Sequence, residues 1–261
     1  MSHLHIPDGV IPLGWSLMWL VLALIWLALS LHVLRREDRS RLVPRVGIFA
    51  AVMILGMSVE WFGVYHLNLT VFSGIALGPW AGFVAQFLAN LMLSLLGHGG
   101  ITTLGLNSLV LGSEVVIGYL LFRLFKRLWT RGGDARAGGM ARRFAVPAFW
   151  ATLVALVFSF TLMMGALGIS IGDTAAVWDV LSRHHDNHGD ESPNQAYHET
   201  EHGEAQHEAL QDELRVGSFS LMNFIRAAVV PGVIGWPVEA LIVAALVGYI
   251  GHVRPGFFQR L

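Results

Sequence analysis

Long runs of apolar residues, separated by short polar breaks, make up most of the sequence. A helix needs about 20 mainly apolar residues to cross a hydrocarbon layer of roughly 30 Å, since it rises 1.5 Å per residue. Runs of about this length or more occupy residues 14–34, 46–63, 67–122, 144–171 and 232–251. The pattern predicts an all-α fold, a polytopic membrane helix bundle.

The longest run, residues 67–122, is too long for one span. It is broken at Gly78-Pro79 and at the Gly-His-Gly-Gly sequence of residues 97–100. A single crossing would leave too much apolar chain, whereas three short crossings joined by tight turns fit its length. The sequence therefore predicts about seven transmembrane helices.

Arginine and lysine positions predict the orientation, because basic loops stay on the cytoplasmic side. Two basic segments, residues 35–45 and 123–143, are expected there. The N-terminus is then outside and the C-terminus inside, in a multi-pass protein of the cell (plasma or inner) membrane. No basic region precedes the first span, so we expect it to be retained rather than cleaved as a signal peptide.

Charge divides the chain into three parts. Residues 172–215 hold eleven acids and two bases, a net charge of −9, while the remainder carries +8. We expect residues 1–171 to form the N-terminal metal-binding segment and first transmembrane helices, residues 172–216 an acidic, His-rich and largely disordered extracellular loop, and residues 217–261 the last transmembrane helix and tail. The overall charge of −1 argues against nucleic acid as a partner, and the absence of cysteine excludes thiolate chemistry.

Histidine is the residue type that suggests chemistry. Two histidines, His3 and His5, lie near the amino terminus, and His66 ends the second span on the same outer side. An α-amine, the intervening backbone amides and a nearby imidazole can enclose one metal ion in small chelate rings. Such a planar nitrogen set favours Ni²⁺ or Cu²⁺ over Mg²⁺, Ca²⁺ or Mn²⁺. If Met1 is removed, His3 becomes the second residue and one backbone amide lies between it and the α-amine. These groups fill three of the four planar positions, and the fourth stays open for an imidazole such as that of His66. The alternative interpretation is a solvated tail and a histidine at the lipid headgroups.

Other polar residues in apolar surroundings are expected to face the bundle interior, because each is costly in hydrocarbon. They are Glu60, Gln86, Asn90, Asn107, Glu114, Arg226 and Glu239. Pairing between helices is the simpler interpretation for most of them. Asn107, which closes the glycine-rich break containing His98, is expected near the metal site together with His98, Met1 and Ser2.

The acidic segment contains six histidines among its carboxylates. They are His184, His185, His188, His198, His202 and His207. Neutral imidazoles and carboxylates in a flexible tract collect divalent ions weakly, although the same composition also occurs in plain solvated linkers.

Three motifs resemble one family. The opening His5-Ile6-Pro7-Asp8-Gly9 is similar to the start of the CbiM/NikM proteins, the substrate-capture membrane subunits of energy-coupling-factor cobalt and nickel importers. Residues 77–82 (Leu-Gly-Pro-Trp-Ala-Gly) and 97–107 (Gly-His-Gly-Gly-Ile-Thr-Thr-Leu-Gly-Leu-Asn) resemble its central signature, and residues 239–242 (Glu-Ala-Leu-Ile) resemble its last helix. The acidic loop lies outside the resemblance.

The resemblance implies a six-helix core with an added N-terminal helix, and an amino terminus that binds Co²⁺ or Ni²⁺ as the transported substrate. It implies as partners a transmembrane coupling protein, two ABC-type ATPases, a small accessory membrane subunit and membrane lipid. The chain departs from the family pattern because three residues separate Met1 from His5. We therefore expect His3, His5 and His66 as the metal ligands, with the order of His3 and His5, and the choice among cobalt, nickel and zinc, left open.

Two rival functions are considered. A membrane haem b redox subunit needs histidine pairs at the middle of facing spans, whereas these histidines lie near ends and breaks. A metal-binding sensor or buffer would be built around the acidic loop. The sequence lacks a nucleotide-binding Gly-x-x-x-x-Gly-Lys-Ser/Thr loop, so we expect a transporter subunit, not an enzyme, with energy coming from partner ATPases.

Overall fold

The computed structural model describes residues 11–58, 60–61, 65–97, 100–131, 139–185, 221–254 and 256–258. Within these ranges it contains seven helices and one short hairpin: α1 (Leu13–Leu34), α2 (Arg39–Ser58), β1 (Glu60–Trp61), β2 (Tyr65–His66), α3 (Thr70–Leu77), α4 (Pro79–Leu95), α5 (Leu104–Arg131), α6 (Gly139–His185) and α8 (Leu221–Val253).

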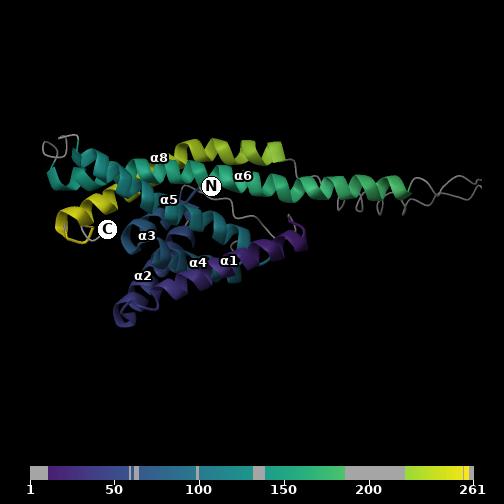
Figure 1. The fold of residues 1–261 in the computed structure, drawn as a ribbon. Helices are drawn as coiled ribbons and strands as arrows, with labels where there is room; N and C mark the ends of the chain where they lie inside the picture. Colours follow the sequence, from purple (N-terminus) through teal and green to yellow (C-terminus); the bar gives the residue numbers. More distant parts are fainter. Residues whose placement is uncertain are drawn as a thin grey trace, which may run out of the picture.

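Helix α5 occupies the middle of the bundle. It packs against α1, α3 and α4 on one side and against α6 on the other, and α6 in turn packs along α8. Figure 1 shows α6 and α8 side by side along one edge of the molecule, with α1, α2 and α4 along the opposite edge. A side chain on α5 can therefore reach both halves of the bundle.

The expected all-α membrane bundle is confirmed. Five helical segments are long and apolar enough to cross a membrane: Leu13–Leu34, Arg39–Ser58, Leu104–Trp129, Ala141–Ser170 and Gly232–Val253. Helix α1 exposes apolar side chains over most of its surface, including Leu17, Val21 and Ile25. A helix that is apolar all round and yet uncovered suits a lipid solvent, so this is a multi-pass membrane protein.

The three helices expected within residues 67–122 are found as α3, α4 and α5, but the first of them is shorter than a full span. Helix α3 has only eight residues and rises about 12 Å, too little to cross the hydrocarbon. The break follows from Gly78, whose φ is +84°, and from Pro79, which begins α4. Residues 67–69 precede α3 without helical structure, so this stretch and α3 together advance about 22 Å. The number of helices among the described residues is seven, but α3 is a partial one.

Helix α6 is longer than the sequence predicts. It spans 47 residues, about 70 Å, and Figure 1 shows it extending far beyond the other helices. The acidic segment, expected to be a loop from residue 172, is thus helical as far as His185. Its remainder from residue 186 to residue 216 lies outside the described residues, and its place outside the membrane stays a prediction.

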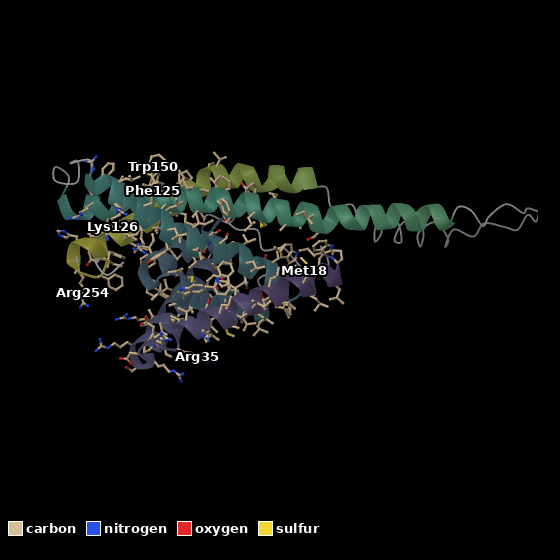
Figure 2. All side chains as sticks on the ribbon, in the orientation of Figure 1. Met18, Arg35, Phe125, Lys126, Trp150 and Arg254 are labelled. Atoms are coloured by element: carbon tan, nitrogen blue, oxygen red, sulfur yellow. The ribbon has the colours of Figure 1, made fainter. Side chains whose placement is uncertain are left out.

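The basic segments lie together at one end of the bundle. Figure 2 shows Arg35, Lys126 and Arg254 toward the same end, with Met18 toward the other. The ammonium of Lys126 donates to the carbonyl oxygen of Phe258 at 2.6 Å, which holds the chain after α8 against the end of α5. This arrangement agrees with the expectation that both basic segments share the cytoplasmic side.

Glycines allow α3 and α4 to approach α5 closely. A Cβ atom on Gly74 of α3 would overlap the carbonyl oxygen of Val115 in α5. A Cβ atom on Gly82 of α4 would lie 2.8 Å from a methyl carbon of the same valine. Small residues at such contacts let backbones pack directly, which is the main attraction available between helices in lipid.

We predict that Gly74→Ala destabilises the protein by about 1–3 kcal/mol, because the added methyl meets backbone rather than a flexible side chain. The matched control is Gly165→Ala in α6, where nothing lies within 4 Å of an added Cβ and alanine is the better helix former. Thermal unfolding of both variants in detergent measures the difference. Equal stability of the two variants would contradict the close α3–α5 contact.

Candidate metal site at the outer end of helix α2

His66 ends a short hairpin that follows α2. Strands β1 and β2 are antiparallel, with Glu60 paired with His66 and Trp61 with Tyr65. The His66 side chain is half-buried. Because it sits on extended chain rather than on a helix, its position depends on the contacts of the residues beside it.

The chain after His66 runs against the end of α2. The backbone amide of Leu67 donates to the carbonyl oxygen of Gly56 at 3.2 Å. A Cβ atom on Gly56 would lie 2.7 Å from the carbonyl oxygen of Leu67, so only glycine permits this approach. The contact fixes the backbone one residue after His66 to the helix before it.

The next polar residue, Asn68, reaches the centre of the bundle. Its amide nitrogen donates to the Glu114 carboxylate of α5 at 2.7 Å, and the hydroxyl of Ser159 in α6 donates to the other carboxylate oxygen. All three side chains are buried. A carboxylate with two donors is tolerated away from water far better than a bare one.

Polar side chains also organise the glycine-rich turn before α5. Gly97 has φ +82°, and the hydroxyl of Thr103 donates to the carbonyl oxygen of Gly100 at 3.1 Å. The Asn107 amide nitrogen donates to the Thr103 hydroxyl at 3.3 Å. Asn107 therefore stabilises the start of α5 locally, and its predicted place beside a metal ion stays a prediction.

Helix α4 carries a buried polar face, with Gln86, Asn90 and Ser94 spaced one turn apart. The Asn90 amide nitrogen donates to the Ser108 hydroxyl at 2.8 Å and lies 3.4 Å from the Leu104 carbonyl oxygen. Within the described part of the chain, neither polar atom of the Gln86 amide has a hydrogen-bond partner. This face links α4 to α5 near the glycine-rich turn.

Most of the predicted ligand set cannot be placed. Met1, Ser2, His3, His5, His98, His188, His198, His202 and His207 lie outside the described residues, and of His184 and His185 only the helical backbone is described. His66 and Asn107 are described. Among the residues that the structure describes, no three His, Cys, Asp or Glu side chains gather to hold a metal ion. The meeting of His66 with His3 and His5 stays a prediction.

The expected interior positions of the polar residues are confirmed where side chains are described. Gln86, Asn90, Asn107, Glu114 and Glu239 are all buried. The side chains of Glu60 and Arg226 are not among those described.

Four buried polar residues were not predicted from the sequence: Asn68, Thr70, Ser108 and Ser159. The alternation of apolar and polar residues in Leu67-Asn68-Leu69-Thr70 was the available signal, since it is typical of extended chain with one polar face.

Two other features lie away from His66. A groove of about 400 Å³ between α1, α2 and α4 is lined by apolar residues such as Leu31, Val43 and Leu88, and lies at the opposite end of α2. His32 and His252 lie in the last turns of α1 and α8. Neither histidine is at mid-span, where a haem b site would need it.

Together, the fold and the histidine at the helix break define a polytopic membrane protein with a candidate cation site. The model of the CbiM family, described as "Cobalt uptake substrate-specific transmembrane region", matches residues 5–257. The chain belongs to this family.

Individual relatives agree with that assignment. The chain is 34% identical over 180 residues to the "Cobalt transport protein CbiM" of Sorangium cellulosum, covering 64% of this chain and 74% of that protein. It is 25% identical over 185 residues to the "Cobalt transport protein CbiM" of Clostridium tetani, covering 68% and 76%. A solved structure described as a transition metal transporter has a similar fold, with a TM-score of 0.64 at 19% identity, and covers 96% of this chain and 93% of that one.

We predict that Ser108→Ala lowers stability by about 1 kcal/mol, because it removes the acceptor that Asn90 uses across the α4–α5 contact. The matched control is Ser113→Ala on the same helix, whose hydroxyl donates to the Val110 carbonyl oxygen of its own helix; this variant should change stability by less than about 0.5 kcal/mol. Thermal unfolding in detergent compares them, and a larger effect at Ser113 would contradict the interhelical role.

Proposed function

We propose that this chain is the metal-capture membrane subunit of an energy-coupling-factor importer for Co²⁺ or Ni²⁺. The observation that carries the proposal is the match of the cobalt-uptake family model to residues 5–257, a range that includes His5 and His66. The cargo ion would bind at the outer end of α2, where His66 stands on an extended segment.

The donors proposed for the ion are the imidazoles of His3, His5 and His66. The ligands besides His66 would come from the N-terminal segment, because the family model matches from residue 5 and the sequence carries His3 and His5 there. Imidazole nitrogens suit Co²⁺, Ni²⁺ and Zn²⁺, and they bind metal only when neutral. Acidification should therefore weaken binding.

The energy source is proposed to lie in partner proteins. The one lysine of the sequence, Lys126, follows Phe125, so no Gly-Lys pair of a phosphate-binding loop exists in this chain. Two ABC-type ATPases would supply ATP hydrolysis, and a transmembrane coupling protein and a small accessory membrane subunit would complete the assembly. The basic segments that end α1 and α5 are the proposed cytoplasmic side.

We predict that His66→Ala weakens Ni²⁺ binding by at least about tenfold, since even the partners that orient a metal ligand are worth 10- to 100-fold. His3→Ala and His5→Ala identify which terminal histidine contributes. The measurement is metal content of the intact purified protein by mass spectrometry, with N-terminal sequencing to establish whether Met1 is retained. His32→Ala, an exposed histidine in the last turn of α1, is the matched control and should bind as the parent does. Unchanged metal content in His3→Ala, His5→Ala and His66→Ala would defeat the proposed ligand set.

A deletion separates an importer subunit from a metal sensor or buffer. Removing residues 186–207, which begin directly after α6, takes away the histidines at 188, 198, 202 and 207. We predict that tight Ni²⁺ binding persists and that only weak additional binding is lost, as measured by isothermal titration calorimetry. Loss of the tight site in the deleted protein would instead favour the sensor or buffer.

A further inference from the structure

The Glu114 carboxylate connects three separate parts of the bundle. It lies eleven residues into α5, about 15 Å along the helix, and none of it is exposed. Asn68 comes from the extended segment before α3, and Ser159 comes from α6. Plain packing does not need a carboxylate here, because apolar residues of similar size commonly stabilise a buried position at least as well as an ion.

Asn68 is fixed at both ends of its amide. Its oxygen accepts the backbone amide of Thr70 at 2.9 Å and also accepts the Thr70 hydroxyl. Its nitrogen is the donor to Glu114 at 2.7 Å. The two contacts together determine which way the amide faces, since the oxygen side is occupied by the start of α3 and the nitrogen side by the carboxylate.

His66 precedes Asn68 by two residues of extended chain, a distance of about 7 Å. The Leu67–Gly56 backbone bond lies between them, and the pairing of His66 with Glu60 in the hairpin holds the segment on its other side. A side chain on such a segment lacks the support of a helix, so its location depends on the attachments of the extended chain, and the Asn68–Glu114 contact is one of them. Moving Asn68 would move His66 with it.

We propose that Asn68 and Glu114 are positioning residues that hold His66 at the place where it binds the cargo ion. This inference rests on the proposed function, because it needs His66 to be a metal ligand. In this proposal the Glu114 carboxylate does not bind the ion itself. It acts on the metal site through Asn68 and the extended chain between Asn68 and His66.

The exchange of amide and carboxylate tests this role. Asn68→Asp alone sets two carboxylates against each other, and we expect Ni²⁺ affinity to fall by about 10- to 100-fold. In the double variant Asn68→Asp/Glu114→Gln, the new aspartate accepts from Thr70 and from the glutamine nitrogen, while the glutamine oxygen accepts from Ser159. These four hydrogen bonds and the net charge are kept, so affinity should return to within about twofold of the parent.

Ser159→Ala is the matched control. It removes the α6 donor to Glu114 but leaves the Asn68 contact, so it should lower thermal stability and leave Ni²⁺ affinity within about twofold of the parent. If the network served only to stabilise the bundle, Ser159→Ala and Asn68→Asp would each change Ni²⁺ affinity in proportion to their loss of thermal stability. The visible spectrum of bound Co²⁺ gives a further readout, and we expect Asn68→Asp to change it as His66→Ala does.

A second variant covers the case in which Asn68→Asp fails to fold. Asn68→Ser drops the contact with Glu114 without adding charge, and it should weaken Ni²⁺ binding in the parent but have no further effect in a His66→Ala background. Unchanged affinity of both Asn68 variants, with His66→Ala weakened, would overturn the positioning role alone. An equal loss from Asn68→Ser with and without His66 would overturn it too. Unchanged affinity of His66→Ala would overturn both the ligand assignment and this inference.

Discussion

A bilayer offers no water to an amide or a carboxylate, so each polar group inside this bundle needs a partner from the protein. That constraint explains why the chain between α2 and α3 can leave the helical state. The backbone amide of Leu67 is satisfied by α2, and the side chain of Asn68 is satisfied by α3 and α5. An extended segment without these contacts would be far more costly than a continuous helix.

The same constraint places glycine and carboxylate at the centre of the fold. Gly56 admits the returning chain and Gly74 admits the backbone of α5, so the groups that must pair are brought within hydrogen-bond distance. Glu114 then gathers donors from segments 46 and 45 residues away in the sequence. Close backbone approach and polar pairing thus occur together at the centre of the bundle.

The sequence predicted the membrane bundle, because a helix must be apolar over about 20 residues to cross the bilayer. It also predicted the interior positions of Gln86, Asn90 and Glu114, because polar side chains are costly in contact with lipid. It did not predict that α3 is only eight residues long or that α6 continues to His185. Apolar content alone does not distinguish a full span from a partial helix preceded by extended chain. Asn68 was missed because its partners, Glu114 and Ser159, are distant in sequence and are found only by tertiary packing.

The position of His66, the proposed metal ligand, on extended chain rather than on a helix has a physical consequence. A histidine in the middle of a helix is located by every contact that the helix makes, whereas His66 is located by the attachments of an extended segment: the hairpin pairing with Glu60, the Leu67–Gly56 backbone bond and the Asn68–Glu114 contact. These contacts lie outside the backbone hydrogen bonds of the helices that cross the membrane. In the importer subunit proposed above, separating the attachment of His66 from the stability of the bundle would let the site change while the fold persists.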